Sequence, residues 1–392
     1  MATVQLAERP GAAPRRPFLG TSGDSATPPL TPASTRRGKR LTKHALKSLQ
    51  RLITASRSSA LCWYPSSGQV AVDVGRALTA QVSGVHRCGS GWSCVVCAPV
   101  IRQRRAGDID QGVNGWLSKG GGAEFVTLTC SHGVEDLLEP RLAAMAGALH
   151  SLLQGAAWER FKKRLGYVGS IRAIEVTWGQ ENGWHPHNHV VLLFERPLTD
   201  WERQELWRWL HNRWSGVLLA KGLGSITEAH GVDVRQVTGE VLGEYLTKVD
   251  GGWSTGLELA RGDVKRGKSA GITPFELLAD FAATGDLDSK RRWLEYEAAT
   301  FGKRWLRWTP GLRARLLGTE VEETDEQLAA SEGVDLALVR WMVEGAEFRQ
   351  HVRRGTTGLL LDEIEEAAGL VIFLSDLLGH ELQPLAAGGQ GP

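Results

Sequence analysis

The fold of this 392-residue chain is decided by three short stretches, AEFVTLTC (123–130), GSIRAIEVTWG (169–179) and HPHNHVVLLF (185–194). All three are rich in β-branched and apolar residues, which is typical of β-strands. The sequence GQENG (179–183) supplies a turn between the last two, so these should form an antiparallel hairpin. The third stretch starts with alternating polarity and ends in an unbroken apolar run. This pattern predicts a strand that helices cover on both faces.

Helical periodicity surrounds these strands. Leu, Ala and Met recur at helical spacing over 139–165, and Thr199 or Asp200 can cap a helix that runs to about Trp214. Another strand is expected at 226–237, followed by a helix of about three turns at 241–250. Mixed strands and helices around a hairpin indicate an α+β fold with one central sheet. Beyond residue 256 the pattern is mostly helical, through 273–281 and 291–308.

Composition divides the chain into five expected parts. Pro, Gly and Arg dominate the first 40 residues, and four of the five cysteines lie between residues 60 and 105. The expected parts are a disordered basic tail (1–40), a basic helix with a Cys-rich zinc-binding module (41–120), the α+β core (121–256), a helical extension (257–318) and an acidic helical C-terminal region (319–392).

Charge is distributed unevenly along the chain. The net charge is only +2, but residues 1–57 carry eleven Lys or Arg side chains against Glu8 and Asp24, and an acidic segment opens at Glu320. This asymmetry predicts either a polyanion-binding N-terminal part or a solubilising tail. No stretch reaches the roughly 18 unbroken apolar residues of a membrane helix. The Arg- and Pro-rich N-terminus lacks the apolar core of a signal peptide, so we expect a cytoplasmic protein.

The strongest chemical signal is the row of histidines at His185, His187 and His189. Side chains two residues apart on a strand share a face, so these imidazoles should point the same way. Surface histidines at a polar strand start are the alternative to a metal site. For a metal, Glu175 on the neighbouring strand is the natural carboxylate ligand beside His187 and His189, and His185 is the other choice. Imidazole and carboxylate ligands suit Mg²⁺ or Mn²⁺ with waters and a phosphate oxygen, and do not exclude zinc.

The cysteines predict a second, structural metal site. Cys88, Cys94 and Cys97 have the spacing of a zinc knuckle, and Cys62, which we favour, or His86 can complete it. Cys130 lies on the apolar face of its strand and is expected to be a small buried hydrophobe. The basic cluster behind the knuckle should contact nucleic acid phosphates, or else form a solvated helix face. It consists of Arg102, Arg104 and Arg105.

A third signal is Tyr245 with Lys248 on the expected helix at 241–250. Tyrosine can act as a covalent nucleophile when a nearby cation lowers its pKa and neutralises the charge that develops on phosphate. A packed tyrosine beside a solvent-facing lysine is the alternative. The pair gains weight only from the other two signals.

Taken in order, these elements resemble motifs of the rolling-circle replication initiators, in the His-hydrophobic-His endonuclease superfamily. FVTLTCSH (125–132) is similar to the first motif, HPHNHVVLLF to the metal-binding second motif, and GEYLTKV (243–249) to the third, which carries the nucleophile. The small-plasmid branch with one catalytic tyrosine is the nearest match, and it also has a Cys-rich segment before the first motif. TPFELL (273–278) resembles actinobacterial members. The resemblance covers about residues 60–280.

The resemblance implies roles for individual residues. His187 and His189 would hold the divalent cation and Tyr245 would attack the scissile phosphate. Asn188 stands where the motif usually has a hydrophobic residue. The branch also has a water-activating Glu four residues before the tyrosine, where this chain has Val241. That role would fall to Glu240, which we favour, or to Glu244.

The resemblance also implies an activity and its partners. We expect an endonuclease-like central antiparallel sheet with flanking helices, a DNA-nicking and strand-transferring enzyme, and a 5′-phosphotyrosine intermediate. Single- and double-stranded origin DNA would be the substrates. A host helicase and DNA polymerase would be required, since the chain has no P-loop. A transposase or relaxase of the same superfamily, a non-catalytic zinc-dependent DNA-binding regulator and a small-substrate metallohydrolase are the rival interpretations.

Overall fold

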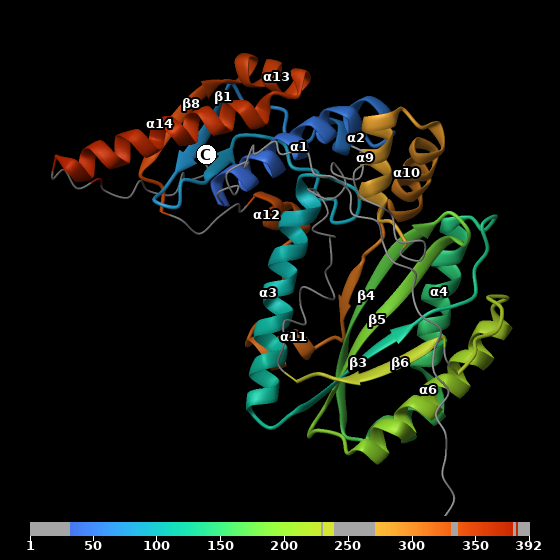
Figure 1. The fold of residues 1–392 in the computed structure, drawn as a ribbon. Helices are drawn as coiled ribbons and strands as arrows, with labels where there is room; N and C mark the ends of the chain where they lie inside the picture. Colours follow the sequence, from blue (N-terminus) through green and yellow to red (C-terminus); the bar gives the residue numbers. More distant parts are fainter. Residues whose placement is uncertain (1–31, 229, 239–270, 331–335, 379–381, 383–392) are drawn as a thin grey trace, which may run out of the picture.

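The computed structural model describes residues 32–228, 230–238, 271–330, 336–378 and 382 (Figure 1). Its largest element is a five-stranded antiparallel sheet with strand order β6-β3-β5-β4-β7. The strands are β3 (Gly122–Leu128), β4 (Tyr167–Gly179), β5 (Gly183–Phe194), β6 (Val232–Gln236) and β7 (Leu306–Trp308). The expected hairpin is confirmed, because β4 pairs with β5 from Gly179↔Gly183 onward. The fold is therefore α+β, and β5 is its central strand.

Helices cover both faces of this sheet, as the apolar run on β5 predicted. One face packs against α4 (Leu138–Leu152), α5 (Gly155–Arg164) and α6 (Asp200–Ala220), with Val190 and Leu192 in that core. The other face packs against α3 (Cys97–Ser118) and α11 (Leu312–Leu317), with Val191 and Leu193 in the second core. Alternate residues of one strand thus enter two cores. Within the described parts of the chain, no helix has the length and apolar character needed to span a membrane.

Two helix boundaries differ from expectation for local reasons. The helix expected over 139–165 is two helices, α4 and α5. Gly155, at the start of α5, has a positive φ of 82°, which interrupts the helical backbone there. The helix expected over 291–308 ends as α10 (Leu287–Thr300), and Gly302 with φ 68° turns the chain. Leu306–Trp308 then pairs with β4 as the edge strand β7. By contrast, Thr199 caps α6 through the expected capping interaction with Glu202.

A second, three-stranded antiparallel sheet contains segments from both ends of the chain. Its order is β2-β1-β8, formed by β1 (Gln69–Val74), β2 (Ala80–Ser83) and β8 (Val339–Glu344). The C-terminal region (319–392) was expected to be helical; its described residues contain three helices, but β8 is a strand. The segment VRWMVE is rich in β-branched and aromatic residues and aligns along the whole of β1. The helices α12 (Asp325–Ala330), α13 (Gly345–Arg354) and α14 (Thr357–Leu377) complete this region.

The N-terminal helix α1 (Pro32–Ile53) joins the two regions. It begins nine residues before the expected start at Leu41 and is followed by a short helix, α2 (Arg57–Leu61). Residues 32–40, expected to be disordered, are thus helical. In Figure 1, α1 lies between α14 and the pair formed by α9 (Pro274–Thr284) and α10. Because its buried residue Leu46 shares a core with both small-sheet and α9 residues, α1 is an integral part of the fold.

Candidate functional site

The histidine motif lies on β5, between β3 and β4. The strand register places Glu175 of β4 opposite His187 and Thr127 of β3 opposite His189. Directly paired residues point to the same face of a sheet. This face is the one that packs on α3, since Val191 continues the same alternation into that core. The register thus brings the carboxylate expected from β4 next to the histidines.

His189 is held on three sides. Its Nε2 lies 2.7 Å from Oε2 of Glu175, its Nδ1 lies 3.3 Å from Oγ1 of Thr127, and its ring stacks on Phe125. In the tautomer that leaves Nε2 free to bind a metal, Nδ1–H donates to Thr127. A separation of about 3 Å is normal between neighbouring ligands of an octahedral ion with bonds of about 2.1 Å. The His189–Glu175 pair therefore fits a shared divalent cation.

His187 lies beside this pair and has an unused nitrogen. Its ring is parallel to that of His189, with 5.9 Å between the centroids. Its Nδ1 is buried and has no hydrogen-bond partner among the described residues. His185 lies 4.0 Å from His187, and His132 lies 4.1 Å from His185, in both cases between ring centroids. The structure therefore extends the histidine row by His132, the last residue of the quoted FVTLTCSH stretch.

Burial keeps His185 and His187 neutral. It is the main cause that lowers the pKa of His187 to about 4 and that of His185 to about 3, and neighbouring histidines add to the effect. Glu175 opposes both shifts. Neutral imidazole is the form that binds metals. Among the described residues, however, only the cysteines bring three or more ligand atoms within 4.8 Å of one another. On the histidine face, His189 and Glu175 form a close pair, and the ring of His187 lies beside it.

The remaining predicted catalytic residues, Tyr245, Lys248, Glu240 and Glu244, lie outside the described residues. The described segments that precede residue 239 and follow residue 270 both hydrogen-bond to the central sheet. The backbone N–H of Val237 donates to the carbonyl of Ala123 on β3, and Ile272 pairs with Trp178 on β4. These two attachments lie on opposite sides of β5, the histidine strand.

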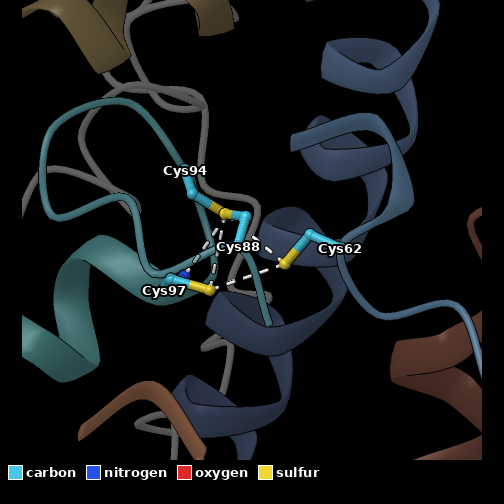
Figure 2. A group of neighbouring side chains, drawn as sticks. All are labelled: Cys62, Cys88, Cys94 and Cys97. Carbon is cyan, nitrogen blue, oxygen red and sulfur yellow. Dashed lines mark hydrogen bonds between the residues drawn. The ribbon is translucent and has the colours of Figure 1, made fainter. Parts of the chain in front are cut away.

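Four cysteines form the second candidate site. Figure 2 shows the thiols of Cys62, Cys88, Cys94 and Cys97 turned toward one another. Cys62 follows α2, Cys97 begins α3, and the other two lie in the loop before α3. The Sγ atom of Cys62 lies 3.5 Å from that of Cys97 and 3.7 Å from that of Cys94, and the Cys88–Cys97 distance is 3.8 Å.

These distances fit a tetrahedral zinc ion. Zinc–sulfur bonds of about 2.3 Å put the corners of a tetrahedron about 3.8 Å apart. The same distances are far longer than the roughly 2.05 Å of a disulfide bond. Of the two alternatives for the fourth position, the fold groups Cys62 with the others and leaves His86 outside the cluster. Cys130 is buried elsewhere, in the core of the five-stranded sheet.

Two of the three arginines behind the cysteines, Arg102 and Arg105, are buried and make internal contacts, whereas Arg104 is partly exposed. Arg102 is buried, donates to the carbonyl of Gly91 and lies over the ring of Trp305. Arg105 is also buried and pairs with Glu322 and Asp325. Both side chains therefore fix the start of α3 to the rest of the protein. The acidic segment that opens at Glu320 supplies the partners of Arg105.

Comparisons with known proteins show which family the chain resembles. A family model described as "Replication protein" (Rep_1) matches residues 85–335, which include the histidine strand and three of the four clustered cysteines. The "Protein rep" of Streptomyces lividans is 35% identical over 336 residues, covering 68% of this chain and 72% of that protein. A "Neomycin resistance protein" of Streptomyces cyanogenus is 36% identical over 134 residues, covering 28% of this chain and 31% of that protein. No solved structure matches.

Proposed function

The chain belongs to the Rep_1 family of replication proteins, and from this premise we propose that it initiates rolling-circle replication of a plasmid. Its activity would be metal-dependent, site-specific nicking and rejoining of one DNA strand. The observation that carries the proposal is the pairing of His189 with Glu175 beside His187 on the central strand of an antiparallel sheet. A sheet with paired histidines on its central strand agrees with an endonuclease fold of the His-hydrophobic-His type.

The described residues would bind and orient the reacting phosphate. His187, His189 and Glu175, with His185 as the alternative ligand, would hold Mg²⁺ or Mn²⁺, which when bound polarises a phosphate oxygen. Thr127 fixes the orientation of His189 through Nδ1. Phe125 closes one side of the same ring and excludes water there. These contacts leave the Nε2 side of His189 directed at Glu175, where the phosphate would approach.

The chemical step would be a transesterification. The phenolic oxygen of Tyr245 forms a bond to phosphorus, the bond to the 3′ oxygen breaks, and that oxygen takes up a proton as a free 3′-OH. Lys248 would stabilise the phenolate and the charge on the phosphate. The 5′-phosphotyrosine conserves the bond energy, so no ATP is consumed. Attack by a 3′-OH, or by a water that Glu240 or Glu244 activates, would resolve the intermediate.

The same proposal defines the partners. The protein would bind single- and double-stranded origin DNA in the bacterial cytoplasm. A host DNA polymerase would extend the 3′-OH, and a host helicase would separate the strands. Zinc at the four cysteines would be structural.

A covalent-adduct assay tests the proposal. Protein is incubated with single-stranded plasmid DNA and Mn²⁺ or Mg²⁺, then run on a denaturing gel beside Tyr245→Phe and the double variant His187→Ala/His189→Ala. We expect a protease-sensitive protein–DNA band that both variants lack. Tyr167→Phe and His150→Ala serve as matched controls and should retain the band.

The outcomes separate the rival functions. A band that persists in Tyr245→Phe would move the nucleophile to another residue. No band on DNA that the protein binds tightly would favour a non-catalytic zinc-dependent regulator. Adducts on transposon ends or a transfer origin, without plasmid-origin adducts, would favour a transposase or relaxase.

A further inference from the structure

A lysine is completely buried beside the cysteine cluster. Lys47 of α1 is 0% exposed, and its Nζ donates to Sγ of Cys94 at 3.3 Å. Its two other hydrogen bonds go to the side-chain oxygens of Gln50 and Ser59, at 3.1 and 3.2 Å. The three protons of the ammonium group therefore have three partners, one of which is a thiol sulfur. Lysine is almost never fully buried unless it is paired.

The four cysteines explain why the charge can be buried there. A zinc ion with four thiolates carries a net charge of −2, so a buried cation next to it is electrostatically favourable. All three hydrogen bonds of the Lys47 Nζ go to side-chain acceptors, as an ammonium group requires. The sequence motif alone does not indicate this residue, since Lys47 lies 15 positions before Cys62.

The same helix holds the loop that carries Cys94. Gln50 of α1 is also 0% exposed; its Nε2 donates to the carbonyl of Ser93, and its Oε1 accepts from the N–H of Val95. Arg51 donates to the carbonyl of Cys62. Helix α1 therefore contacts the backbone on both sides of Cys94 and at Cys62.

Other residues of α1 tie it to distant parts of the chain. Arg40 pairs with Asp362 and Glu365 of α14, and Ser48 donates to the carbonyl of Val352 in α13. Thr54, just after α1, donates to Glu297 of α10. A change in how α1 sits on the cysteine cluster would therefore reach α10, α13 and α14.

We propose that Lys47 is a positioning residue of the cysteine metal centre, and that its charged hydrogen bond to Cys94 couples metal binding to the seating of helix α1. This inference rests on zinc binding by the cysteines, which is part of the proposed function, and is independent of DNA nicking. With zinc bound, the negative centre holds the lysine and hence α1. Without zinc, the four sulfur atoms are no longer held in one position, Lys47 loses its fixed acceptor at Cys94, and α1 loosens.

Zinc affinity is the first test. The full-length protein and Lys47→Met are compared by competition with a chromophoric zinc chelator, after circular dichroism has shown equal helix content. Removing a hydrogen-bonding partner of a metal ligand typically weakens metal affinity by about 10–100-fold, and we expect a loss in that range. Lys119→Met, an exposed lysine at the end of α3, is the matched control and should bind zinc like the wild type. Equal affinity of Lys47→Met and wild type would overturn the inference.

Limited trypsin digestion of the wild type is a second test that needs no folded variant. We expect zinc-loaded protein to resist cleavage at Lys43, Lys47 and Arg51, and protein stripped with a chelator to be cut there. Protection that persists after stripping would overturn the coupling. If the wild type binds no zinc, the proposed zinc site itself is disproved. If it binds zinc tightly and Lys47→Met has no effect, the zinc site stands and only the role of Lys47 is disproved.

Discussion

His187 is a candidate metal ligand whose charge state depends on its burial. Its pKa is lowered to about 4, chiefly by burial. A lowered pKa leaves the imidazole neutral, and able to bind metal, down to a lower pH. At about pH 5.5 an ordinary imidazole with a pKa of about 6.5 is about 90% protonated, which would weaken metal binding about tenfold. With a pKa of about 4, His187 would be only about 3% protonated at that pH.

We therefore expect protonation of His187 to lower the Mn²⁺ affinity of the zinc-loaded protein by less than about threefold between about pH 7.5 and 5.5. Electron paramagnetic resonance of free Mn²⁺ measures this affinity directly. The variant His187→Asn identifies the relevant site, because it should lose binding at both pH values. A tenfold or larger loss in the wild type would mean that protons compete at an ordinary imidazole, contrary to the burial seen here.

Asn188, next to His187 in sequence, is a polar side chain that is buried against an apolar core. It is 1% exposed, it lies between His187 and His189 in sequence, and its Oδ1 and Nδ2 have no hydrogen-bond partner among the described residues. Alternation turns it to the other face of the sheet, where its strand neighbour Val190 belongs to the apolar core. An unpaired buried polar group costs about 1–3 kcal/mol.

Asn188→Leu should accordingly raise the free energy of unfolding by about 1–3 kcal/mol, since Leu has a similar size and no polar atoms. Urea unfolding followed by tryptophan fluorescence measures the change. The same substitution at the exposed Asn114 on α3 should alter stability by less than about 0.5 kcal/mol. A destabilised Asn188→Leu would show that the amide has a partner in the native protein.

At the scale of elements, the secondary structure was predicted best where a sequence pattern was long. The strand at 185–194 and its hairpin followed from a 10-residue alternation and apolar run with a turn in front. β7 and β8 were missed, because strands of three and six residues are defined by the partner they pair with. Likewise, apolar periodicity does not reveal the positive φ angles of Gly155, where α5 begins, and of Gly302, just after α10.

In the candidate sites, too, residues that follow a local sequence pattern were predicted, and residues that depend on tertiary contacts were not. Alternation indicated the histidine face, and the hairpin indicated Glu175, whose position opposite His187 the structure bears out. Thr127 and His132 were not identified, since they approach the histidines from another part of the chain. Cys62 was favoured over His86 from the sequence, and the structure groups it with the other three cysteines. The internal role of Arg105 could not be predicted, because it depends on contacts between segments far apart in sequence.

At the scale of the whole molecule, the charge asymmetry of the sequence is partly neutralised within the fold. Basic residues near the N-terminus pair with acidic residues near the C-terminus, as in Arg40 with Asp362 and Glu365, and Arg76 with Asp376. The small sheet adds backbone pairing between β1 and β8. The described N- and C-terminal segments thus form one unit around the cysteine cluster, and part of the basic charge is unavailable to DNA.

These two ion pairs give a test of that unit, because both connect the same regions but differ in burial. Arg40 and its partners are about nine-tenths buried, whereas Arg76 and Asp376 are about half exposed. Removing one partner of a buried ion pair leaves the other charge buried without a partner, which lowers the free energy of unfolding by about 3–5 kcal/mol. An exposed pair contributes less than about 1 kcal/mol to that free energy. Arg40→Met should therefore lower the free energy of unfolding by about 3 kcal/mol. Arg76→Met should change it by less than about 1 kcal/mol and lose even that effect in high salt. Equal effects of the two substitutions in denaturant titrations would mean that α14 does not hold α1 through Arg40.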